Sequence, residues 1–214
     1  GDGKADVYFD PGDKYIWSLA IMNDGSVAVG TGDSGKLYRV RAAGASPESS
    51  LLVNTNQTHV ISLAVTAQGD LIAGTDSGGL VLRVSPEGKT FALFDTQLRE
   101  IHALAPAADG SIYALALSDA AASTRAPSTP AAPTPQPTES TTPTTSVTIT
   151  AVDESGAAIQ GQSTPARSRN DVSSARSAVF RILPDGATDV VWSSTTVTAF
   201  AIAPSLQPGS VLIG

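Results

Sequence analysis

An internal repeat is the feature that most constrains how this 214-residue chain can fold. Three segments align with one another without a gap, and a fourth aligns after two extra residues in its turn. Equivalent leucines at 19, 63 and 104 give a period of about 40 to 45 residues, the length of one four-stranded unit in known repeat folds. The segments are Ile16 to Thr31, Val60 to Thr75, Ile101 to Ala116 and Val197 to Gly214.

Each repeat contains four apolar runs that are separated by turn residues. The first and second runs are joined by a Gly-containing turn such as Asp24-Gly25 or Asp109-Gly110, and this turn needs the positive φ that glycine adopts easily. A single four-stranded unit cannot bury both of its faces, so its neighbours must cover them. We therefore expect an all-β fold, a β-propeller with about three full four-stranded blades and partial blades at both ends.

Both ends of the chain align with the interior of a repeat. Residues 2–10 match residues 87–95, which predicts an outer strand there, and residues 211–214 match residues 27–30. We interpret the chain as a fragment of a longer protein. A four-bladed ring that the first strand completes is the alternative.

A long insertion interrupts the third repeat. Of the 24 residues from Ser123 to Ser146, 18 are Pro, Thr or Ser. Such a segment cannot bury enough apolar area to offset the entropy lost on ordering. We expect blades over residues 1–117, a disordered Pro/Thr/Ser-rich insert over 118–177, and blades again over 178–214. The insert is either a spacer or docking segment, or a tolerated loop expansion.

Composition narrows the classes of partner. The net charge is −7 and the pI is about 4.6, so electrostatics predicts no nucleic-acid partner. No apolar run approaches the roughly 18 residues that span a bilayer, so no membrane insertion is expected in this segment, and no signal peptide is visible. The absence of cysteine excludes disulfides and Cys-ligated metals. No cofactor is predicted.

Two glycine-rich motifs imitate catalytic signatures. Gly30 to Gly35 matches the G-x-G-x-x-G pattern of dinucleotide sites, and Gly32-Asp33-Ser34-Gly35 resembles the nucleophile loop of trypsin-like proteases. A second strand follows at once instead of a helix, and neither histidine has a matching context. We interpret both motifs as hairpin turns. The arginines that recur at 39, 83 and 181 favour cross-strand pairing over an anion-binding stripe.

Five residues lie at or just before the start of the first strand in their repeats. In a propeller these positions surround one mouth of the channel, which is a usual ligand site. The predicted ligand-binding residues are Tyr15, Trp17, His59, Glu100 and His102. A more specific alternative is a metal or acid–base site formed by the His and Glu residues at the same mouth.

The repeated pattern W/I-S-L-A-x-x-x-D-G-x-x-x-x-G-T-x-x-x-G-x-x-x-R-V resembles blades of bacterial propeller proteins of the NHL, WD-repeat-like and two-component-regulator-propeller group. The resemblance covers residues 2–117 and 178–214, although the third repeat lacks the Gly-Thr turn. It implies a periplasmic, cell-envelope or secreted location and no established reaction.

The function that we expect is non-catalytic binding or scaffolding in a sensory or envelope setting, with an unknown protein or small-molecule ligand. The alternative is a lyase- or hydrolase-type propeller enzyme that uses the channel-mouth His and Glu residues. A purely structural repeat segment is a third interpretation.

Overall fold

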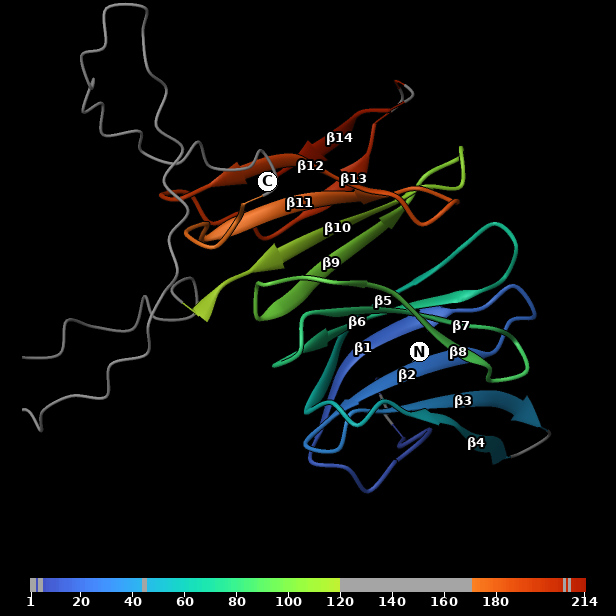
Figure 1. Ribbon diagram of the computed structural model, residues 1–214. Coiled ribbons are helices and arrows are strands. Elements are labelled where there is room, and N and C mark those ends of the chain that lie inside the picture. The colour runs from blue at the N-terminus through green and yellow to red at the C-terminus, as the bar shows by residue number, and fades with distance from the viewer. Residues whose placement is uncertain (1–2, 4–5, 44–45, 120–170, 206, 208) are drawn as a thin grey trace, which may run out of the picture. The chain divides into compact units, whose positions relative to one another are not determined.

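The computed structural model describes residues 3, 6–43, 46–119, 171–205, 207 and 209–214, and these residues form fourteen antiparallel β-strands (Figure 1). The all-β class that the sequence predicted is confirmed. In chain order the strands are β1 (Tyr15–Ile21), β2 (Val27–Gly32), β3 (Lys36–Ala43), β4 (Ser46–Asn54), β5 (His59–Val65), β6 (Leu71–Asp76), β7 (Leu80–Val84), β8 (Thr90–Asp95), β9 (Glu100–Pro106), β10 (Ile112–Leu117), β11 (Ser177–Ile182), β12 (Thr188–Ser194), β13 (Ile202–Pro204) and β14 (Val211–Ile213).

Turn chemistry accounts for the local connections. Gly25, Gly69 and Gly110 follow the first strand of their repeats, and each has a φ between 79° and 90°. The amide of Gly25 donates to the carbonyl of Met22, which closes the turn between β1 and β2. The four apolar runs predicted for each of the three repeats are observed as strands, and the turns between the first and second strands are encoded locally.

The strands follow one another in three antiparallel groups. We call them the first group (β1–β4), the second group (β5–β8) and the third group (β9–β12), and in each group consecutive strands pair. Two single bridges join the groups, Gly32 with His59 and Asp76 with Glu100. The twelve strands thereby form one sheet, whereas β13 and β14 form a separate two-stranded sheet.

The predicted β-propeller is wrong. Among the described residues the groups are not separate blades but are joined by these two bridges in one twelve-stranded antiparallel sheet, whose main path runs openly from β12 to β4 without closing, with β1, β7 and β8 off that path. The repeat encodes turns and apolar alternation inside each group, but the pairing between groups depends on the strand ends. Gly32 has no side chain, so the backbone of His59 can approach it and extend the ladder.

The chain before β1 also differs from the expectation. The strand predicted over residues 2–10 is absent from the described residues 6–10, which carry no strand assignment. Phe9 instead packs against Tyr38 of β3, with ring centroids 5.6 Å apart. This aromatic contact places the segment next to the first group without a ladder of backbone hydrogen bonds.

Side chains between successive groups form the hydrophobic core. Leu37 of the first group packs with Val60 and Leu71 of the second, and Val81 of the second packs with Ile101 and Phe180 of the third. A third cluster joins the third group to the β13–β14 sheet. Its buried members are Ala105, Tyr113, Leu115, Leu117, Val179 and Ala199.

Most of the predicted insert, residues 120–170, lies outside the described residues, so the division at 118 and 177 stays a prediction. No helix within the described part of the chain is long and apolar enough to cross a membrane.

Candidate functional site

A row of paired residues crosses the sheet where the predicted site residues lie. Tyr15 pairs with Gly32, Gly32 with His59, His59 with Asp76, and Asp76 with Glu100. The row therefore brings together the beginnings of β1, β5 and β9 and the ends of β2 and β6. Its side chains separate into two clusters.

The first cluster is aromatic, and we call Tyr15, Trp17 and His59 the aromatic platform. Ring centroids are 5.4 Å apart for Tyr15 and Trp17, and 5.5 Å apart for Trp17 and His59. Half of the Trp17 surface remains exposed, and Tyr15 is also exposed. A β-bulge between Ile16 and Ser18 shifts the register of β1 at Trp17.

Hydrogen bonds hold the imidazole of His59 in one orientation. Its Nδ1 accepts the indole N–H of Trp17 at 3.3 Å and the backbone N–H of Asp33 at 3.2 Å. In the neutral ring the proton therefore lies on Nε2, which is 3.9 Å from the Asp76 carboxylate. With Nδ1 accepting two donors, His59 serves as a fixed support for the indole.

Gly32 makes room for this arrangement. A Cβ placed on Gly32 would lie 2.2 Å from the indole nitrogen of Trp17 and 2.6 Å from His59 Nδ1. Both distances are shorter than real Cβ contacts. Any side chain at this position must therefore displace the indole or the imidazole.

An ionic chain continues from His59. Asp76 is nearly buried and accepts a hydrogen bond from Arg99 Nε at 2.9 Å, and Arg99 also contacts Asp119 at 2.8 Å. Two hydrogen bonds, the one to Asp119 having the larger effect and the one to Asp76 the smaller, raise the pKa of Arg99 above its usual range. The guanidinium is neutralised on both sides by carboxylates.

A cavity of about 750 Å³ opens beside this chain. It is lined by Arg99 and Asp119 together with Ser77, Gln97 and Ser174. Because two carboxylates already neutralise Arg99, the lining does not offer an anion an unpaired positive charge.

Glu100 and His102 form the second cluster. The Glu100 carboxylate lies 2.9 Å from His102 Nδ1, and the imidazole meets the ring of Phe200 edge-on with centroids 5.7 Å apart. Within the described residues, no hydrogen bond or ring contact links this pair to the aromatic platform. The five predicted residues are therefore divided between two clusters.

Sequence reasoning missed the residues that complete both clusters. Asp33 and Asp76 bind the imidazole of His59, and Phe200 covers His102. Asp76 occupies the repeat position that holds Gly32 in the first group, and this departure from the repeat was the available signal. The described residues contain no group of three or more His, Asp or Glu side chains able to hold a metal ion.

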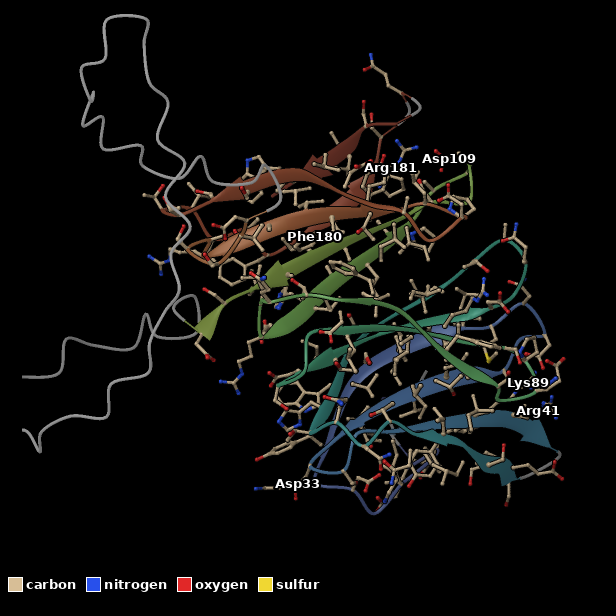
Figure 2. All side chains as sticks on the ribbon, in the orientation of Figure 1. Asp33, Arg41, Lys89, Asp109, Phe180 and Arg181 are labelled. Carbon is tan, nitrogen blue, oxygen red and sulfur yellow. The ribbon has the colours of Figure 1, made fainter. Side chains whose placement is uncertain are left out.

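The recurring arginines pair across strands, as predicted. Arg181 contacts Asp109 and the hydroxyl of Ser111 at one end of the third group (Figure 2). Arg39 makes the same contacts with Asp24 and Ser26 in the first group. In the second group Asp70 replaces the serine and Gln68 the aspartate, and Arg83 lies 4.0 Å from Asp70.

The glycine-rich motifs form turns between paired strands. Asp33 and Gly35 both have positive φ in the connection from β2 to β3, and Ser77 and Gly79 repeat this geometry between β6 and β7. The interpretation of these motifs as hairpin turns is confirmed.

Comparison with known proteins assigns no family. No family model matches the chain, and no curated protein matches it either. The likeness to bacterial blades therefore stays a resemblance between short motifs.

Proposed function

We propose that this chain is a non-catalytic binding protein that holds an extended, proline-rich peptide against Tyr15 and Trp17. The observation that carries this proposal is the combination of exposure and fixation at Trp17. Half of its surface is open to solvent while its N–H is held by His59. Binding loses little side-chain entropy when the contacting residue is already held in place before the ligand arrives.

The residue types support peptide binding. Trp and Tyr are enriched among the residues that contribute most to binding energy, because they offer a large rigid surface. Two neighbouring aromatic rings are also the usual receptor for polyproline II segments, which bind at low entropic cost. The indole N–H is occupied by His59, so the expected contact is ring stacking rather than hydrogen bonding.

The chain itself supplies a suitable probe sequence. Pro127, Pro130 and Pro133 recur at intervals of three. A polyproline II helix has three residues per turn, so a synthetic peptide of residues 126–138 would present these prolines along one edge. A control peptide with the three prolines changed to glycine removes that edge and keeps the length.

The fluorescence of Trp17 tests the proposal. The chain has two tryptophans, and Trp192→Phe leaves Trp17 as the single reporter. Titrating this variant with the proline peptide is expected to change the emission saturably, whereas the glycine peptide leaves it unchanged. Tyr15→Ala, made in the same background, should weaken binding by at least roughly fivefold.

Gly32→Ala provides the matched control for fixation. It keeps both aromatic residues but places a Cβ within 2.2 Å of the indole nitrogen, so binding should weaken although the ligand-contacting residues are unchanged. Equal titrations with both peptides, or saturable binding that Tyr15→Ala leaves intact, would contradict the proposal.

An enzyme that uses Glu100 and His102 is the competing function. A carboxylate 2.9 Å from Nδ1 resembles the orientation of a general base in hydrolases. Hydrolysis of nitrophenyl esters above the buffer rate that His102→Gln abolishes would favour this enzyme. Proline-peptide binding that His102→Gln leaves intact would favour the aromatic platform.

A further inference from the structure

The first group presents an apolar face that no other group covers. We call Ile16, Leu19 and Ile21 of β1, with the half-buried Val27 of β2, the outer face. Ile16, Leu19 and Ile21 are 47%, 63% and 76% exposed. Three large apolar side chains on one strand form an unusual surface for an isolated protein.

The same repeat positions are covered in the second group. Val60, Leu71 and Ala73 align with Ile16, Val27 and Val29, and all three are fully buried. Leu63 and Val65, which align with Leu19 and Ile21, pack against the same cluster.

The third group repeats this burial. Ile101 and Ala114 align with Ile16 and Val29 and are also fully buried, and Ile112 aligns with Val27 and is nearly so. Burial at the Ile16 position therefore depends on having a neighbouring group, because the residue types are alike, whereas Val29 is buried in the first group as well.

The covering side chains come from one face of the preceding group. Met22, Ala28 and Leu37 of the first group pack against the second, and Ile72 and Val81 of the second pack against the third. A polar contact accompanies each joint. The hydroxyl of Ser18 donates to the carbonyl of Val60, and that of Ser62 donates to the carbonyl of Ile101.

The β13–β14 sheet carries the complementary positions and leaves them open. Leu212 aligns with Ala28 and Ile72, and Ala201 and Ala203 align with Ala20 and Met22. All three are exposed, Leu212 at 62%. We call Ala201, Ala203 and Leu212 the far face.

We propose that the far face of one molecule docks onto the outer face of a second copy, head to tail. The chain already forms this kind of contact between successive groups, and the proposed contact continues that series with the same positions. A joint of this kind uses two different surfaces, so it does not close after two molecules.

Residues before β1 limit how much of the outer face is open. Val7, Tyr8 and Phe9 line an apolar cavity of about 370 Å³ together with Ile16, Leu19 and Val40. Val40 is nearly buried, whereas Leu19 is open. The docking surface is therefore centred on β1, and Leu19 is its most informative residue.

Sedimentation velocity over a concentration series tests the proposal. The wild-type chain is expected to form species larger than a dimer as its concentration rises. Leu19→Glu blocks the outer face, and Leu212→Glu blocks the far face. Each variant alone should raise the dissociation constant by more than roughly tenfold. Val191→Glu, at an exposed apolar residue of β12, is the matched control and should behave as wild type.

Mixing the two variants gives the sharper result. Leu19→Glu retains its far face and Leu212→Glu retains its outer face, so one intact joint remains. The mixture should form a dimer that does not extend.

Three outcomes would overturn the proposal. They are a wild-type chain that stays monomeric throughout, association that Val191→Glu weakens as strongly as Leu19→Glu does, and a mixture that remains monomeric while the wild type associates.

Discussion

The first and third groups share their local structure and differ in their surroundings. Both have the same strand order, and in both an arginine bridges an aspartate and a serine, Arg39 in one and Arg181 in the other. Ile16 of the first group is 47% exposed, yet Ile101 at the equivalent position is fully buried. Turns follow from nearby sequence, and the Arg–Asp–Ser contacts, which we call the corners, follow from pairing within a group, whereas burial follows from the presence of a neighbouring group.

The largest expected effect tests that contrast directly. Ile101→Ala should lower the free energy of unfolding by about 3 kcal/mol, because it leaves a cavity among packed side chains. Ile16→Ala should lower it by less than about 1 kcal/mol, because solvent already reaches that residue. Urea denaturation of the two variants measures both values. Similar losses would mean that the outer face of the first group is covered in solution.

The joints between groups give the next effect. Ser177 is fully buried, donates to the carbonyl of Val197 and accepts from the amide of Ala199. Ser177→Ala leaves both backbone groups without this partner, so a loss of about 2 kcal/mol is expected.

Ser18→Ala removes one hydrogen bond at a half-buried site and should cost about 1 kcal/mol or less. Hydrogen exchange at Ala199 in the Ser177→Ala protein checks the mechanism. An amide that remains as protected as in the wild type would contradict it.

The fold was predictable up to the level of the group. Asp-Gly turns, alternating apolar residues and the recurring arginines predicted the strands and corners, since each depends on residues close in sequence or on one cross-strand contact. How groups join was not predictable. One bridge between Gly32 and His59 unites two groups in a single sheet, and no period in the sequence specifies it.

The candidate site was predictable only in part. Alignment placed Tyr15, Trp17 and His59 at strand starts, and they meet in the structure. Glu100 and His102 form a separate pair. The expectation that all five residues share one mouth assumed a closed ring of blades, and the observed sheet does not close. The contacts of Asp33 and Asp76 with His59 depend on pairing between groups, which the repeat does not encode.

The corners, Arg181 with Asp109 in the third group and Arg39 with Asp24 in the first, provide a pH test in which stability should respond in the same way. Hydrogen bonds from Ser111 and the Arg181 guanidinium lower the pKa of Asp109 from 3.8 to about 2, and Ser26 and Arg39 lower the pKa of Asp24 in the same way. Their stabilisation is complete above the unfolded pKa and is lost as pH falls toward the folded pKa.

Asp109→Asn and Asp24→Asn should therefore each reduce the urea midpoint at pH 7, and the deficit should shrink between pH 4 and pH 2. Each variant removes one negative charge, so the pair is matched for net charge. A deficit that grows on acidification would contradict the assignment, and a large difference between the variants would show that the corners are not equivalent.

The smallest expected effect concerns an aligned position at which the third group has a much larger side chain than the first. Tyr113 of the third group aligns with Ala28 of the first, and its buried hydroxyl has no hydrogen-bond partner among the described residues. Removing an unsatisfied buried hydroxyl relieves a desolvation cost, so Tyr113→Phe should change the free energy of unfolding by about 0 to +1 kcal/mol. Tyr113→Leu, which also removes the aromatic ring, should be destabilising, and urea denaturation compares the two. A loss on Tyr113→Phe as large as that on Tyr113→Leu would mean that the hydroxyl, rather than the ring that packs between the third group and the β13–β14 sheet, accounts for the tyrosine.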